Sequence, residues 1–113
     1  MTTASQILAA YDSVKLWDPG LTSKIQDDVA DAYGIAQDVA NRRQQRGERH
    51  VGYKIGFTTE AAMSSFGLRS PMWGRVWDTT LTSAAPDSIV SLSLTNYVQP
   101  KIEPEFVVRF RRI

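Results

Sequence analysis

Two glutamates near the end of the sequence have the spacing of a paired carboxylate site. Glu103 and Glu105 flank Pro104, and side chains two residues apart on a β-strand project from the same face. Two carboxylates held that close repel one another and raise a pKa unless a cation lies between them. Mg²⁺ and Mn²⁺ are cations that favour hard oxygen ligands. The pattern therefore indicates either a metal site or two solvated glutamates on an outer sheet face, and spacing alone favours the solvated pair.

A lysine stands between two glycines in the second feature that could carry chemistry. The segment 51–57 alternates as a β-strand does, with Gly52, Lys54 and Gly56 on one face and bulky apolar residues on the other. No side chain of its own strand crowds Lys54, so another group could approach the backbone there. Lys54 is either a lysine that contacts substrate or handles a proton, or a surface lysine on an edge strand. Spacing alone favours the surface lysine.

Composition narrows the remaining chemistry. The 113 residues are 42% hydrophobic, which is enough for one small domain, and 13 Lys and Arg balance 12 Asp and Glu. This balance argues against broad binding to nucleic acid or to an anionic membrane, and no apolar segment is long enough to span a bilayer. The absence of cysteine excludes a disulfide scaffold, a thiolate metal site and a cysteine nucleophile. A single histidine, His50, argues against a histidine zinc site, and we expect a cytoplasmic domain whose chemistry uses oxygen, Lys or Arg groups.

Hydrophobic periodicity changes from a helical repeat to a strand repeat along the chain. Apolar spacing and capping residues predict helices first, and period-two alternation predicts strands after residue 50. The expected helices cover 3–15, a stretch from Ser23 to Arg46, and 59–66; the expected strands cover 51–57, 75–81, 89–95 and 102–110; residues 17–20 and 70–74 are expected to be turns.

The long helix has the clearest boundary signals. Ser23 and Gln26 have capping-box spacing, and Gly47 is suited to the residue that follows a helix. Arginines in the last turns, Arg43 and Arg46 among them, are interpreted as cations that complement the helix dipole rather than as a nucleic-acid patch. The last strand is so apolar that it needs a partner.

An ordered series of short motifs resembles a known family. The motifs are Asp31-Ala32-Tyr33, Arg42-Arg43, Gly47-Glu48-Arg49, 52–59 (GYKIGFTT), Phe66-Gly67-Leu68, 70–74 (SPMWG) and 100–106 (PKIEPEF). In this order they resemble the 2-keto-4-pentenoate hydratase and 4-oxalocrotonate decarboxylase branch of the fumarylacetoacetate hydrolase superfamily. The resemblance covers nearly the whole chain.

The resemblance implies both a fold and an activity. The fold is α+β, with an N-terminal helical region over 1–48 and the first part of a fumarylacetoacetase-like mixed β-roll or sandwich over 49–113. The activity is a metal-dependent lyase in aromatic meta-cleavage catabolism, either a hydratase of 2-hydroxy-2,4-dienoates or a decarboxylase of 4-oxalocrotonate-type acids. Carried over by motif, Glu103 and Glu105 are ligands of Mg²⁺ or Mn²⁺, Lys54 is catalytic, and Phe57 and Thr58 form the substrate wall.

Two departures from the family pattern shape the expectations. Met72 stands where hydratases of the family often carry Asp, which leaves hydration and decarboxylation both open. Family chains are much longer and take a third metal-ligating carboxylate from a later segment. We therefore expect a truncated form with an incomplete ligand set and little activity alone. The alternative is a non-catalytic relative that acts through self-association, as a homo-oligomer, or as the partner of a full-length subunit.

Overall fold

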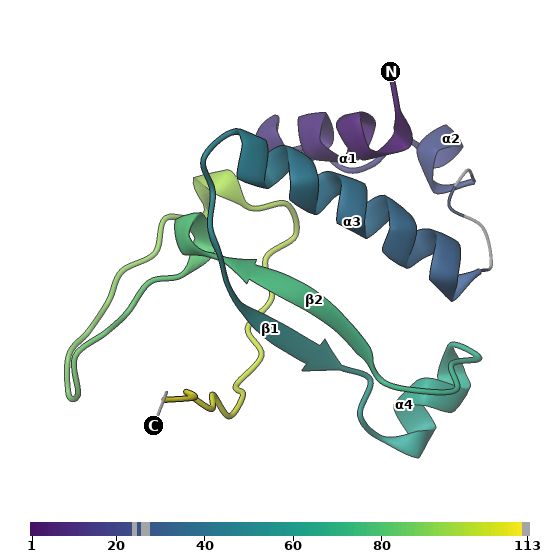
Figure 1. The fold of residues 1–113 in the computed structure, drawn as a ribbon. Coiled ribbons are helices and arrows are strands. Elements are labelled where there is room, and N and C mark those ends of the chain that lie inside the picture. Colours follow the sequence, from purple (N-terminus) through teal and green to yellow (C-terminus); the bar gives the residue numbers. More distant parts are fainter. Residues whose placement is uncertain (24, 26–27, 112–113) are drawn as a thin grey trace.

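A computed structural model describes residues 1–23, 25 and 28–111 of the chain. Its helices and strands confirm the expected α+β class, with helices first and a two-stranded antiparallel sheet after them (Figure 1). None of the helices in the described ranges is both long and apolar enough to cross a membrane. The elements are α1 (Thr3–Asp12), α2 (Pro19–Thr22), α3 (Val29–Gln45), β1 (His50–Gly56), α4 (Glu60–Ser65) and β2 (Met72–Trp77), with 3₁₀ turns at Asp78–Thr80 and Leu94–Asn96.

The helix boundaries follow from their capping residues. Asp28 caps α3, because its Oδ1 accepts a hydrogen bond of 2.7 Å from the Ala30 N–H. The predicted start at Ser23 is wrong, since Ser23 ends α2, and the Gln26 half of the predicted box lies outside the described residues. The predicted end is correct: Gly47 follows the α3 C-cap with a φ of +96°, a conformation that glycine adopts without strain.

The sheet is a single antiparallel pair with a bulge near its start. Lys54 lies opposite Gly74 in the register, and the bulge lies between His50 and Gly52. β1 is close to its prediction. The turn predicted at 70–74 is wrong, and the strand predicted at 75–81 is correct only over 75–77, because β2 begins at Met72 and ends at Trp77. Pro71 has no N–H to donate, so the ladder with β1 starts directly after it.

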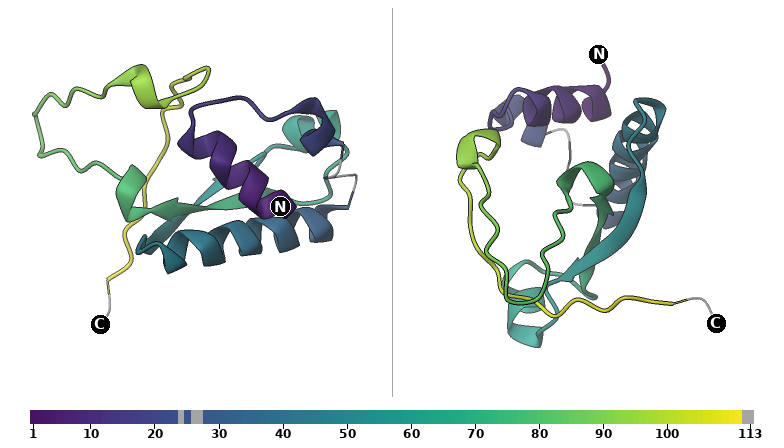
Figure 2. Two further views of the ribbon diagram at one scale, coloured as in Figure 1. Left: turned by 90° about the horizontal axis from the view of Figure 1, so that it is seen from above. Right: turned by 90° about the vertical axis from the view of Figure 1, so that its left-hand side faces the viewer.

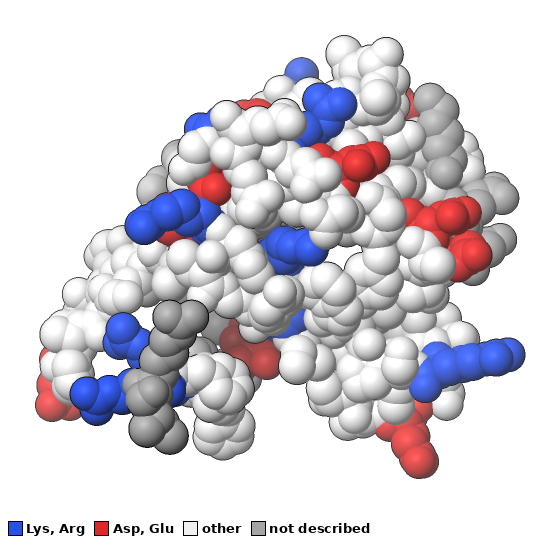
Figure 3. Space-filling view, viewed as in Figure 1, with Lys and Arg blue, Asp and Glu red and all other residues white. Residues whose placement is uncertain are grey.

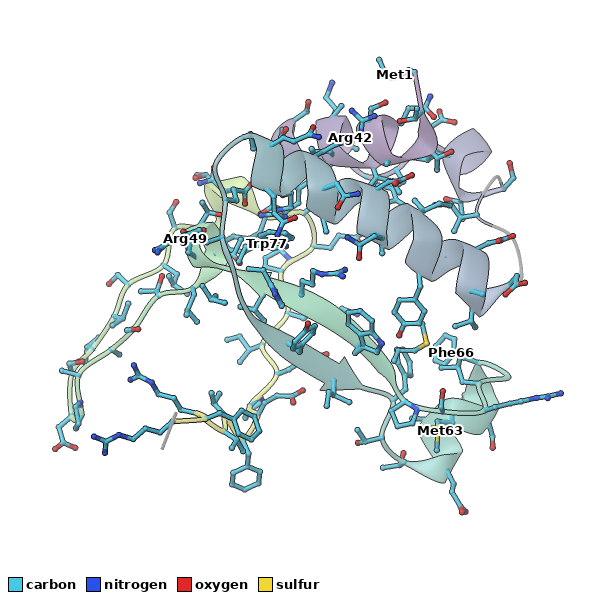
Figure 4. The ribbon with its side chains drawn as sticks, viewed as in Figure 1. Met1, Arg42, Arg49, Met63, Phe66 and Trp77 are labelled. Carbon is cyan, nitrogen blue, oxygen red and sulfur yellow. The ribbon has the colours of Figure 1, made fainter. Side chains whose placement is uncertain are left out.

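Aromatic contacts attach α3 to β2. The Tyr33 ring stacks on the Trp73 ring with a centroid distance of 4.9 Å, and the Tyr33 hydroxyl accepts a 2.9 Å hydrogen bond from the Trp73 N–H. Figure 4 shows α3 lying along the sheet, with Trp77 between the helix and the strands. Few hydrophobic residues of the described chain are buried, namely Ala4, Leu21, Ala40 and Trp77. Polar contacts therefore provide much of the cohesion of the fold.

A buried charge network joins the end of α3 to the rest of the fold. Arg43 and Glu48 are 7% and 8% exposed, and their side chains form a 2.6 Å ion pair. Arg46 also bonds Glu48, and the Thr79 hydroxyl donates to it at 2.6 Å. Burial raises the pKa of Glu48, but the hydrogen bonds from Thr79, Arg43 and Arg46 outweigh it and lower that pKa below its ordinary value. The interpretation of Arg43 and Arg46 as dipole partners was therefore incomplete.

The last third of the described chain lies outside this packed part. Every described residue from Leu81 on is exposed, and Figure 2 shows this segment looping out and then running past the sheet. The strands predicted at 89–95 and 102–110 are wrong, because neither segment pairs with another strand within the described residues, and Leu94–Asn96 forms a 3₁₀ turn instead. The radius of gyration is 16.0 Å, against about 13 Å for a compact chain of this length.

Candidate functional site

Lys54 and the paired glutamates meet although they are about fifty residues apart in the sequence. Lys54 projects from the middle of β1, and its Nζ lies 3.0 Å from Glu103 Oε2 and 2.7 Å from Glu105 Oε1. Both carboxylates therefore converge on one cation. The predicted strand is absent, but the 103/105 spacing still brings the two oxygens to a single point.

The site has one positive and two negative groups, a formal net charge of −1, and all three are accessible to solvent. Side-chain exposures are 51% for Lys54, 63% for Glu103 and 46% for Glu105. Hydrogen bonds from Lys54 to Glu105 and then to Glu103 raise the pKa of the lysine, so the ammonium stays protonated at neutral pH. Ion pairs this exposed contribute little stability, which leaves the carboxylates free to exchange one cation for another. Acidic and basic groups are interspersed over the face of the molecule in Figure 3.

Glycines surround Lys54 on its face of the sheet. Gly52 and Gly56 are its neighbours along β1, as the alternation predicted, and Gly74 lies directly across the ladder on β2. A Cβ added at any of the three would meet no atom within 4 Å. Gly74 was not predicted to face Lys54, because residues 70–74 were expected to form a turn. The signal that could have found it is the alternation of 72–77 as a partner strand for 51–57.

The donor set at this point matches a hard divalent cation. Two carboxylates converge on one positive charge, and magnesium is commonly bound by one or two carboxylates with water completing its shell. Within 1–23, 25 and 28–111, no group of three or more His, Cys, Asp or Glu side chains could hold a metal. The residues present therefore fit an ion that keeps most of its shell as water.

The other predicted site residues lie near β1 but outside the Lys54 contacts. Phe57 follows β1 with a φ of +55°, a strained conformation for a bulky residue, and its ring meets the Phe66 ring at 5.0 Å. The interactions that join Lys54 to the glutamates do not include Phe57 or Thr58. His50, the single histidine, is half-buried, and its ring nitrogen lies 2.8 Å from the Gly52 carbonyl.

Known proteins similar to this chain carry two activity names. The chain is 35% identical over 79 residues to a 4-oxalocrotonate decarboxylase of Pseudomonas putida, covering 70% of this chain and 28% of that protein. It is also 35% identical over 86 residues to a 2-hydroxypent-2,4-dienoate hydratase of Pseudomonas putida, covering 75% and 37%. A solved 4-oxalocrotonate decarboxylase from Pseudomonas putida G7, complexed with magnesium and adipate, matches with a TM-score of 0.62 and 28% identity over 68% of this chain. Over most of its length the chain is therefore similar to proteins named as hydratases and to proteins named as decarboxylases.

The similarity to these hydratases and decarboxylases extends over only part of each relative. The chain spans about a third of the length of the relatives that it matches, from 28% to 37% for those described above. The same decarboxylase from Pseudomonas putida G7 is also solved in complex with calcium and acetate. No protein-family model matches the chain. The activity of a whole family member is therefore a proposal for this chain.

Proposed function

We propose that this chain carries the lysine and paired-carboxylate part of a metal-dependent lyase that acts on small 2-oxo or 2-hydroxy-dienoic acids in meta-cleavage catabolism. The observation that carries the proposal is the convergence of Glu103 and Glu105 on the Lys54 ammonium, at 3.0 and 2.7 Å. Two findings on relatives support it. Proteins similar to this chain are named as hydratases and decarboxylases, and the solved decarboxylase is complexed with a divalent metal and a small acid.

Each residue of the site has a separate task. Glu103 and Glu105 hold Mg²⁺ or Mn²⁺, and a bound metal of this kind supplies Lewis-acid polarisation of a substrate carbonyl. When the two glutamates hold the metal in place of the Lys54 ammonium, the three N–H donors of Lys54 are released to bind an anionic oxygen of the substrate. Phe57 and Thr58, directly after β1, provide the wall for the hydrocarbon part. The reaction is then addition of water to the diene or loss of carbon dioxide.

The test measures both turnover and binding in the full chain. We expect Mg²⁺-dependent binding of adipate in calorimetry and, because the ligand set is incomplete, only slow Mg²⁺-dependent loss of the ultraviolet absorbance of 2-hydroxypenta-2,4-dienoate or 4-oxalocrotonate. Lys54→Met should lower turnover about 10²–10³-fold, which is typical for loss of one donor to a developing oxyanion, whereas Lys54→Arg should retain more adipate binding. If adipate does not bind in Mg²⁺, the proposed function is wrong.

A second candidate function, self-association, is favoured by the exposed apolar segment 102–111. Ile102, Phe106 and Phe110 are each more than 90% exposed. Contiguous exposed apolar residues in an unpaired extended segment favour pairing with another chain.

The charge pattern of this segment is complementary to itself in one antiparallel register. If two copies pair symmetrically about Val107, Glu103 faces Arg111 of the second copy and Glu105 faces Arg109. When these are the hydrogen-bonded pairs of the ladder, Pro104 occupies a position whose N–H is not needed. We infer that two copies would pair in this register. In the dimer, Glu103 and Glu105 would form ion pairs with Arg111 and Arg109 of the other copy instead of binding a metal.

Charge exchange separates this second candidate from non-specific aggregation. Light scattering after size exclusion should show a dimer for the natural chain, a monomer for Glu105→Arg, and a dimer again for Glu105→Arg combined with Arg109→Glu. A natural chain that stays monomeric at high concentration, or a double variant that fails to restore the dimer, would reject the register.

A further inference from the structure

The face of the sheet around Lys54 is cleared of side chains on three sides. Gly52 and Gly56 precede and follow it on β1, and Gly74 lies opposite on β2. Because a strand rises about 3.3 Å per residue, the stretch from Gly52 to Gly56 exposes about 13 Å of backbone with one side chain at its centre. We call this exposed backbone around Lys54, formed by Gly52, Gly56 and Gly74, the glycine surface.

The fold itself does not require glycine at these positions. A Cβ at Gly52, Gly56 or Gly74 would meet nothing within 4 Å, and none of the three has a positive φ. Gly47 and Gly67 differ, since their φ values of +96° and +65° disfavour any other residue. Glycine inside a strand weakens the strand. Gly52 borders the bulge of β1, which is a local reason for one of the three, but Gly56 and Gly74 need a reason outside local folding, and close approach of another molecule is such a reason.

Side chains of β2 that lie opposite Gly52 and Gly56 define the two ends of the glycine surface. Val76 lies opposite Gly52 and is half-buried, so it forms an apolar boundary at one end. Met72 lies opposite Gly56, but its sulfur is turned towards the Tyr33 hydroxyl of α3, 3.8 Å away. The glycine surface is therefore bounded by Val76 at the Gly52 end and is more open at the Gly56 end.

We infer that Gly52, Gly56 and Gly74 form a contact surface on which a planar, extended dicarboxylic acid lies against the sheet backbone, with one of its carboxylates on the Lys54 ammonium. This inference rests on the proposed function and adds the part of the chain that selects a flat, extended substrate. The glycines act by leaving room, so a single methyl group placed there lifts the acid away from Lys54 and from the Glu103 and Glu105 oxygens.

Alanine substitutions test the contact surface without disturbing the fold. Gly74→Ala and Gly56→Ala should unfold at the temperature of the natural chain or above it and should bind Mg²⁺ as before. Their affinity for adipate should fall about tenfold or more, because an extra methyl group forced into a close contact costs enough free energy to lower binding by that factor. Affinity for acetate, which is too short to extend across the glycine surface, should change less. Gly34→Ala on α3, whose added Cβ also meets nothing within 4 Å, is the matched control and should leave both affinities unchanged.

The outcomes separate this inference from the proposed function. If the natural chain does not bind adipate in Mg²⁺, the proposed function itself fails. If the natural chain binds adipate and both glycine variants bind it equally well, the proposed function stands and the contact surface is wrong. A marked loss of thermal stability in Gly74→Ala and Gly56→Ala would also overturn the inference, because the glycines would then serve the fold.

Discussion

Replacing Glu103 and Glu105 together with glutamine should remove the affinity of the chain for Mg²⁺ and Mn²⁺. The exchange keeps the size of both side chains but removes the two negative charges that converge on the Lys54 ammonium. Loss of a residue that only supports a metal ligand typically costs about 10–100-fold in affinity, so loss of two ligands should exceed that range. Calorimetric titration with MnCl₂ measures the change directly.

The control for this pair is a carboxylate that makes no such contact. Asp38 is exposed on α3, and Asp38→Asn removes one charge of the same sign from the same chain. Its Mn²⁺ affinity should equal that of the natural chain. If the Glu103/Glu105 double variant binds Mn²⁺ as tightly as the Asp38 variant does, the metal is held elsewhere.

Replacing Glu48 with alanine should have the largest effect on stability. Arg43 would keep its buried position over the Tyr11 and Trp77 rings, at 4.8 and 5.0 Å, without the carboxylate that neutralises it. Removing one partner of a buried pair costs about 3–5 kcal/mol, which is a large part of the roughly 5–15 kcal/mol that holds a typical domain folded. Urea denaturation followed by circular dichroism gives the free energy of unfolding.

An exposed ion pair of the same network provides the comparison. Asp12 pairs with Arg46 at 2.8 Å, but the two side chains are 48% and 35% exposed. Asp12→Asn should therefore cost no more than about 1 kcal/mol. Equal losses for the Asp12 and Glu48 variants would show that the buried pair is not the fastening that joins α3 to β1.

The same carboxylate should make the fold sensitive to acid. The folded pKa of Glu48 is lowered below its ordinary value of 4.5, so its contribution is complete above that value and is lost as the pH falls through the folded pKa. The melting temperature of the natural chain should thus decline from about pH 4.5 downwards, and Glu48→Gln should show a flatter profile there.

Features set by local sequence were predictable. The alternation of 51–57 anticipated β1 and the common face of Gly52, Lys54 and Gly56. The hydroxyl of Thr59 caps α4 close to where a short helix was predicted, and Gly47 ends the long helix as expected. In each case the deciding interaction lies within a few residues of the signal, so the sequence alone contains it.

Features that depend on distant partners were not predictable. The Glu48 carboxylate is buried by Arg43, Arg46 and Thr79, and Thr79 is 31 residues away. Gly74 faces Lys54 only because β2 begins directly after Pro71 and pairs with β1. Period-two alternation at 89–95 and 102–110 indicated strands, but a strand also needs a neighbour for its backbone groups, and alternation does not reveal one.

The candidate site was predicted from the order of the motifs along the chain rather than from the spacing of its residues. Spacing alone favoured a solvated glutamate pair and a surface lysine, and all three side chains are indeed about half exposed. The family resemblance placed Lys54, Glu103 and Glu105 in one site, and the structure brings their charged groups together. Their roles as catalytic and metal-binding residues stay predictions.

The most direct test of the account locates the bound metal in the natural chain. Substoichiometric Mn²⁺ added to ¹⁵N-labelled protein broadens the amide signals near the ion, and excess Mg²⁺ should reverse the effect. We predict broadening centred on Lys54, Gly74, Glu103 and Glu105, with the amides around Asp12 and Asp78 unaffected. Broadening centred on any other acidic group, or no Mg²⁺-reversible broadening at all, would contradict a metal site built from Glu103 and Glu105.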